Sequence, residues 1–278
     1  MHEKVDATSK IVASAYLGKA LTFLTKDENQ FQAYFDKAIL LKPDFYQAYA
    51  RVSFALTDAF HEKHLEQSLP YYEKCLNLKP NLNDDAFFEN YGIALYKLGT
   101  FKQDETLFRS AVKQFEKALK IQPEQFNTLC NYGATLSELA TIKHDEILFN
   151  KAFEQFEKAL KIKPDNFNSL SNYGVALSDL AIIKQDEVLL DKAFKQFKKA
   201  LEIKPNETYN IACYYSVTKN LELCKENPLK AEKNSTLPIN PYKQLNEDKD
   251  LENARSESWF IELLERLKSK DENLDKVS

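Results

Sequence analysis

The pattern of hydrophobic and polar positions repeats every 41 residues over the middle of this chain. Residues 124–164 and 165–205 align without gaps and are identical at 26 of 41 positions. Within each copy, apolar residues recur at spacings of three and four, the period of a helix with one buried face. Prolines recur at the same point of the pattern and predict five units, which end near Pro43, Pro80, Pro123, Pro164 and Pro205.

Each unit is predicted to hold two helices joined by a short turn. In the 124–164 unit, Asp145 lies between two apolar stripes, where its carboxylate is expected to cap the start of the second helix. Pro164 follows the second stripe and cannot continue a helix. The pattern therefore predicts an all-α fold of repeated helix–turn–helix units.

Glycine occupies one recurring position of the first helix, although glycine in a helix interior costs about 1 kcal/mol relative to alanine. The residues concerned are Gly18, Gly92, Gly133 and Gly174. Because this cost recurs from unit to unit, we expect it to be offset by packing, with the second helix of each unit approaching the first closely at the glycine. The aromatic side chains expected to fill the space are Phe35, Tyr72, Phe115, Phe156 and Phe197.

The small residue of the first helix and the spacing of the second helix resemble the tetratricopeptide repeat (TPR) family. The second-helix match is carried by Ala193, Phe197, Ala200 and Pro205. The usual repeat has 34 residues, and seven more make about two helical turns, so each helix is expected to gain one turn. The resemblance implies a right-handed α-solenoid over residues 11–217, including a partial sixth unit, with ligands bound along the concave face of the first helices.

The ends of the chain are expected to differ from the repeats. Residues 1–10 and 270–278 are predicted as tails, and 218–247, which contains three prolines, as an irregular linker. Residues 248–269 are predicted as a helix that caps the last apolar face; docking of this helix into a partner's groove is the alternative. The residues that resemble the closing segment of bacterial TPR arrays are Asp250, Leu251, Arg255 and Phe260.

The amino-acid composition argues against several classes of function. The net charge of −4 argues against general nucleic-acid binding, and glutamates interleave with the lysines of the second helices, as on a solvated face. No apolar run approaches the ~20 residues that a membrane helix needs. The four cysteines lie far apart, which fits free thiols in a reducing compartment. A cytoplasmic protein is expected.

No motif in the chain predicts chemistry. Phosphate loops, nucleophile elbows and zinc-protease motifs are absent from the sequence. His61 and His64 share a predicted helix face, but two ligands without a third make a weak metal site. The sequence therefore predicts no catalytic residue, no metal and no cofactor.

An asparagine recurs immediately before the Tyr-Gly position, and Arg51 takes this place in the second unit. The asparagines are Asn90, Asn131, Asn172 and Asn210. Each offers one acceptor and two donors, which can pair with the backbone of an extended peptide. This row resembles the asparagine ladder in the TPR region of O-GlcNAc transferase; packing between neighbouring first helices is the alternative role. Other predicted groove residues are Phe54, Tyr96, Glu138, Ser171 and Asp179.

The sequence thus predicts a non-catalytic scaffold or adaptor that binds a protein or an extended peptide. Two alternatives stay open: a regulatory subunit or accessory domain of an enzyme complex, and a structural protein that associates with itself.

Overall fold

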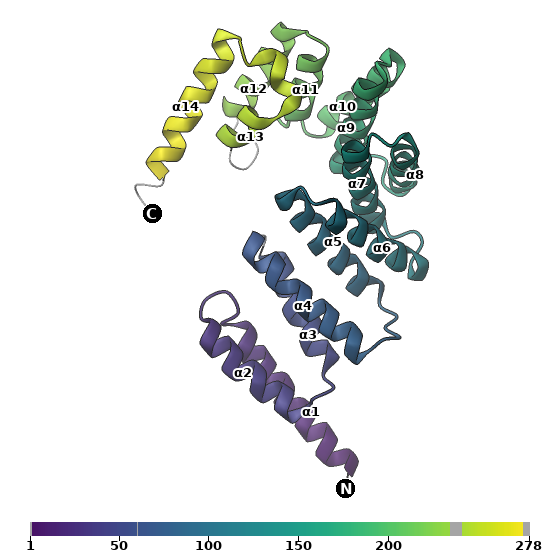
Figure 1. Cartoon of the computed structure of the whole chain (residues 1–278), viewed down its shortest axis with the longest axis vertical. Coiled ribbons are helices and arrows are strands. Elements are labelled where there is room, and N and C mark those ends of the chain that lie inside the picture. Colours follow the sequence, from purple (N-terminus) through teal and green to yellow (C-terminus); the bar gives the residue numbers. More distant parts are fainter. Residues whose placement is uncertain (1, 60, 234–240, 275–278) are drawn as a thin grey trace. The chain divides into compact units, whose positions relative to one another are not determined.

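The computed structural model describes residues 2–59, 61–233 and 241–274, which form helices joined by turns and loops and contain no strand (Figure 1). The predicted all-α fold is confirmed. The chain divides into two compact units, Met1–Lys143 and His144–Ser278, each described by itself. The helices of the first unit are α1 (His2–Leu21), α2 (Glu28–Leu41), α3 (Tyr46–Asp58), α4 (Glu62–Leu78), α5 (Asp85–Lys102), α6 (Glu105–Ile121) and α7 (Phe126–Lys143). Those of the second unit are α8 (Glu146–Ile162), α9 (Phe167–Lys184), α10 (Glu187–Ile203), α11 (Tyr209–Val217), α12 (Leu221–Lys233), α13 (Pro241–Glu247), a 3-10 helix η1 (Lys249–Ala254) and α14 (Ser258–Leu274).

The turns within the long hairpins contain only two residues. The first has a left-handed backbone, with φ near 50° at Gln103, His144 and Gln185. The second is an aspartate that caps the next helix; the carboxylate of Asp145 accepts hydrogen bonds from two backbone amides, as the sequence predicted. Because α7 and α9 have 18 residues and α8 and α10 have 17, the seven extra residues lengthen the helices rather than the turn.

The second helices end two residues before the recurring prolines. At each end, the residue that precedes the proline donates its backbone N–H to a carbonyl of the last turn, as Lys163 does to Ala159. The proline that follows has no N–H and disfavours a helical conformation before it. Each hairpin therefore stops at a sharp, repeated boundary.

Close packing of an aromatic ring on the recurring glycine occurs in both units. A Cβ atom added at Gly92 would lie 2.7 Å from a ring carbon of Phe115, and one added at Gly174 would lie 2.5 Å from Phe197. The prediction is wrong at Gly18, where such an atom would meet nothing within 4 Å. The ring expected there belongs to Phe35, which packs instead edge-on against tyrosines of α3 and α4.

The ends of the chain differ from the sequence-based expectation. Helix α1 begins at His2, so most of the predicted 1–10 tail is helical. Helices α12 and α13 lie within residues 218–247, which were predicted to be irregular, and α12 continues through Pro228. Part of that linker, residues 234–240, lies outside the described residues, as does the end of the predicted 270–278 tail beyond Leu274.

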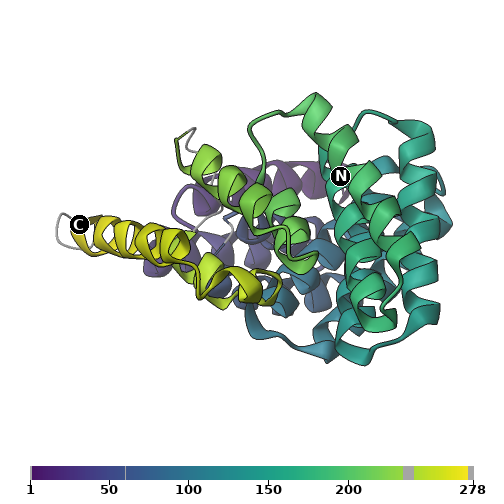
Figure 2. The ribbon, with the colours of Figure 1, turned by 90° about the horizontal axis from the view of Figure 1, so that it is seen from above.

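The closing segment, η1 and α14, packs against the last hairpin of the second unit. Its buried side chains form one apolar cluster with two cysteines of α11 and α12. Figure 2 shows α14, in yellow, beside this light-green part of the chain, and α14 contacts α12 and α13. The buried members of the cluster from the closing segment are Leu251, Ala254, Trp259, Phe260, Leu263 and Leu267.

Candidate functional site

The first helices carry the asparagine row at one shared position. In the first unit this position holds Arg51 of α3, Asn90 of α5 and Asn131 of α7, and these helices contact in that order. In the second unit it holds Asn172 of α9 and Asn210 of α11, which also contact. Arg51 and Asn172 are exposed and the other three are half-buried. The row is therefore accessible within each unit.

The asparagine side chains of the row differ in the hydrogen bonds that they form. The side-chain amide of Asn90 donates to the backbone oxygen of Ala86, 2.8 Å away in the same helix. The side chains of Asn131, Asn172 and Asn210 form no hydrogen bond within the described part of the chain. Three amides are thus available to another molecule, whereas Asn90 has its oxygen available and its nitrogen engaged.

The two aromatic groove residues pack mainly on other rings. Phe54 lies 6.0 Å from the ring of Tyr72 and 6.1 Å from that of Phe87. Tyr96 lies 6.1 Å from Phe108, and burial raises the pKa of its hydroxyl. Both side chains are half-buried. Their contact with a ligand stays a prediction.

The polar residues of the predicted groove are partly or fully buried. Burial raises the pKa of the Glu138 carboxyl in α7. Ser171 of α9 is buried, whereas Asp179 of the same helix is half-buried and acts electrostatically on Asp250 of η1. The acidic members of the predicted groove are thus partly withdrawn from water.

A buried polar chain links α5 to the start of α7. Glu89 is 8% exposed and accepts a 2.8 Å hydrogen bond from Gln125, whose amide oxygen accepts one from Thr128 at 2.9 Å. Burial raises the pKa of Glu89. The sequence analysis did not identify this chain, although a carboxylate directly after two phenylalanines was a usable signal.

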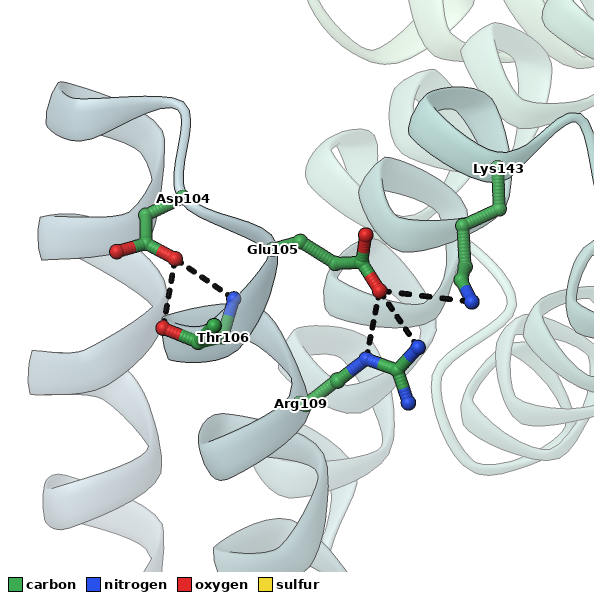
Figure 3. Close-up of polar contacts among 5 residues, drawn as sticks. All are labelled: Asp104, Glu105, Thr106, Arg109 and Lys143. Carbon is green, nitrogen blue, oxygen red and sulfur yellow. Dashed lines mark hydrogen bonds and ion pairs between the residues drawn. The ribbon is translucent and has the colours of Figure 1, made fainter.

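Ion pairs join consecutive hairpins at their turns. Figure 3 shows Asp104 capping α6 through Thr106, while the neighbouring Glu105 carboxylate pairs with Arg109 at 2.6 Å and with Lys143 of α7 at 3.4 Å. Equivalent pairs are Lys102–Glu66 and Lys184–Glu146. The side chains of these pairs are about one third to one half exposed, so the pairs add little stability.

Two cavities lie against the second helices. One, of about 440 Å³, lies between α2 and α4 and is lined by Phe31, His64 and Tyr71 among others. Another, of about 420 Å³, lies between α8 and α10 over Tyr173 and Leu177. The asparagine row lines neither of these two cavities.

Among the described residues, no group of three or more histidine, cysteine, aspartate or glutamate side chains is placed to hold a metal ion. His61 and His64 have ring centroids 5.5 Å apart. No helix within the described ranges combines the length and apolarity required to cross a bilayer.

Comparison with known proteins agrees with this architecture. Residues 102–231, which are 130 of the 278, match the family described as plant-specific mitochondrial import receptor subunit TOM20. No curated protein matches the sequence significantly. Among solved structures, TTC0263, a thermophilic TPR protein of Thermus thermophilus, is 17% identical, with a TM-score of 0.51 over 78% of this chain and 99% of that one.

MamA proteins are a second group of similar structures. MamA from residue 41 onward, from Desulfovibrio magneticus RS-1, is 16% identical, with a TM-score of 0.50 over 69% of this chain and 95% of that one. Another MamA crystal structure is 19% identical, with a TM-score of 0.50 over 70% and 93% of the two chains. The helical pairs, the glycine–aromatic packing and these similarities agree: this chain has the tetratricopeptide repeat fold.

Proposed function

We propose that this protein is a non-catalytic scaffold that binds an extended protein segment along its first helices. The observation that carries the proposal is the row of accessible asparagines, of which Asn131, Asn172 and Asn210 form no side-chain hydrogen bond within the described residues. The TPR fold supports it, because stacked hairpins present one repeated helix face to a partner.

The chemistry of the row suits a peptide backbone. One primary amide can accept from a peptide N–H and donate to a peptide carbonyl. Packed helices lie about 8–10 Å apart and an extended chain advances about 3.3 Å per residue. Within each unit, one asparagine would therefore meet about every third residue of the ligand. Such binding depends little on ligand sequence.

The groups beside the row favour a neutral or weakly basic segment. Glu138 and Asp179 are acidic, and Arg51 is the one basic residue of the row itself. A ligand that ends in a carboxylate would meet few cations here. We place the protein in the cytoplasm, because none of its four cysteines forms a disulfide in the described structure.

The test uses a displayed library of short, unstructured peptides, from which binders of the wild-type protein are selected. Calorimetry then compares wild type, the double variant Asn131→Ala/Asn172→Ala and a matched control, Asn150→Ala, which removes an exposed asparagine from the second helix α8. Each lost hydrogen bond is worth about 0.5–1.5 kcal/mol. Loss of two to four bonds predicts at least a fivefold weakening in the double variant.

The control should bind as wild type does, and the melting temperatures of all three proteins should agree, because these amides support no bond in the described structure. Equal affinity of the double variant and the control for every selected peptide would eliminate the asparagine row as the binding face.

A further inference from the structure

The first hairpin carries aromatic, apolar and lysine side chains along one side of each of its two helices. On α1 these side chains recur at spacings of three and four, which places them on one face of the helix, and those on α2 have the same spacing. We call this surface the Tyr–Lys face. Its residues are Val12, Tyr16 and Lys19 of α1, Phe23 of the turn that follows, and Tyr34, Lys37 and Leu41 of α2.

Ring stacking and cation–π contacts join the two helices across this face. The ring of Tyr34 stacks on that of Tyr16, with centroids 6.4 Å apart, and on that of Phe23 at 5.9 Å. The ammonium group of Lys19 lies 4.5 Å from the centroid of the Tyr34 ring, and that of Lys37 lies 5.4 Å from the same centroid. The Tyr–Lys face is therefore one connected surface rather than a set of scattered side chains.

Part of the Tyr–Lys face is open to water. The three rings are half-buried, both lysines are exposed, and Val12 and Leu41 are 40% and 38% exposed. Neither Lys19 nor Lys37 forms an ion pair within the described part of the chain. None of the seven residues is acidic, and Asp36, the neighbour of Lys37 in sequence, lies about 100° from it around α2. The face thus combines exposed apolar area with positive charge that no carboxylate of the face balances.

Other junctions of this chain show what covers a tyrosine on a first helix. The hydroxyl of Tyr132 in α7 donates to the carboxylate of Glu116 in the preceding second helix at 3.0 Å. Tyr173 of α9 donates to Glu157 of α8 at the same distance. In both units, therefore, a helix that carries a glutamate packs over the tyrosine. The described helices that pack on α1 are α2 and α3, and they leave the exposed part of the Tyr–Lys face uncovered.

We propose that the Tyr–Lys face docks an acidic amphipathic helix of another protein. The apolar side of that helix lies over the three rings and over Val12 and Leu41, and its carboxylates pair with the ammonium groups of Lys19 and Lys37. A helix satisfies its own backbone hydrogen bonds and binds through side chains at spacings of three and four, the spacings found on this hairpin.

The charge of the face favours this partner over a lipid surface. Two lysines are fewer than the roughly four to eight cations that mark binding to anionic lipids, whereas two ion pairs suit one face of a single helix. The proposal is independent of the asparagine row, which begins at Arg51 on α3.

The test measures binding of a designed helix to the full chain. The probe is a synthetic peptide of about 18 residues, longer than the roughly 12–15 that an isolated helix needs, with leucines on one side and glutamates on the other. A second peptide has lysines in place of the glutamates. Fluorescence anisotropy of a dye on each peptide, at physiological ionic strength, gives the two affinities. We expect the acidic peptide to bind at least about tenfold more tightly than the basic one, because like charges across an interface are strongly unfavourable.

Two serine variants locate the apolar part of the site. Val12→Ser/Leu41→Ser removes exposed apolar area from the face and should weaken binding of the acidic peptide about tenfold. The matched control, Ile11→Ser/Leu40→Ser, changes the neighbouring residues, which are 70% and 81% exposed and lie about 100° away around the same helices. This control should bind as wild type does.

Two charge variants locate the lysines. Lys19→Glu/Lys37→Glu should reverse the preference, so that the basic peptide binds more tightly than the acidic one. Lys10→Glu/Lys26→Glu changes the net charge equally at exposed lysines outside the face and should keep the wild-type preference. The charge variants decide the test if circular dichroism shows that Val12→Ser/Leu41→Ser fails to fold.

The proposal is overturned if wild type binds neither peptide or binds both alike, or if each variant binds as its matched control does. Tighter binding of wild type to phosphatidylserine vesicles than to the acidic peptide would assign the face to a membrane and would also overturn it. So would self-association of wild type in sedimentation that Val12→Ser/Leu41→Ser removes, because the occupant would then be a second copy of this chain.

Discussion

Replacing the recurring glycines by alanine separates two opposing effects on stability. Alanine favours a helix by about 1 kcal/mol over glycine, so the substitution stabilises wherever a methyl group fits. At Gly18 an added Cβ meets nothing within 4 Å. Gly18→Ala should therefore stabilise the protein by up to about 1 kcal/mol, less any fraying near the end of α1.

At Gly92 the same methyl group meets the ring of Phe115 at 2.7, 2.8 and 2.9 Å, whereas ordinary contact begins at 3.4 Å. The difference, 3.4 minus 2.7, requires a shift of about 0.7 Å. The ring is fully buried and packs on Tyr132 of α7, so it has little room to move. Overpacking of this kind costs about 1–3 kcal/mol.

Subtracting the helix gain of about 1 kcal/mol leaves Gly92→Ala neutral to about 2 kcal/mol destabilising. Relative to Gly18→Ala, the expected difference is about 1–3 kcal/mol, and Gly174→Ala should behave as Gly92→Ala does. Urea unfolding followed by far-ultraviolet circular dichroism measures it as a shift in midpoint at constant slope. If Gly92→Ala and Gly174→Ala both stabilised as much as Gly18→Ala, the glycine–aromatic packing would not be the reason for these glycines.

The remaining predictions concern single side chains and use the same urea measurement. Phe156→Ala should lower the free energy of unfolding by roughly 3–5 kcal/mol, because the ring is fully buried and stacks on Tyr173. A loss no greater than that of a surface substitution would contradict the placement of this ring in the core. Asp186→Ala should cost about 1 kcal/mol, since its carboxylate caps two amides of α10, and Asp186→Asn should recover most of it. Because burial raises the pKa of Glu138 above its ordinary 4.5, native protein binds extra protons and stability falls as pH rises above that value. Glu138→Gln should therefore be more stable than wild type at neutral pH and equal to it near pH 4; a pH-independent difference would refute this.

The repeated local signals predicted the hairpins well because each acts within a few residues. Asp145 caps α8 through its own neighbouring amides, and Pro164 ends the helix by removing one donor. The glycine packing depends on a second helix, which explains its failure at Gly18. There Phe35 finds tyrosine partners on α3 and α4, a choice that the local pattern does not contain.

Helix α12 shows tertiary packing overriding a local signal. Pro228 disfavours a helix interior, and the sequence analysis therefore predicted an irregular segment. In the structure, Leu221, Cys224 and Leu229 all contact the apolar cluster of the closing segment, and that burial outweighs the missing hydrogen bond. The composition of a short segment does not reveal what it will pack against.

The sequence predicted where the asparagine row lies along the chain, but it did not predict the contacts of the residues around that row. The period identified the asparagine row, and the structure leaves three of its amides without an intramolecular partner in the described residues. The sequence could not reveal that Tyr96 would pack on Phe108, or that Asp250 would lie in electrostatic reach of Asp179. The first depends on how the two helices of one hairpin pack, and the second on an interaction between residues far apart in the sequence.

Trp259 is the only tryptophan of the 278 residues, and it lies in the closing segment at 8% exposure. Indole emission from the intact protein therefore reports local melting of this one end, whereas the peptide-bond signal averages every helix. If the two optical curves separate on heating, the terminal cluster melts independently of the rest, and a single transition temperature would not characterise the molecule.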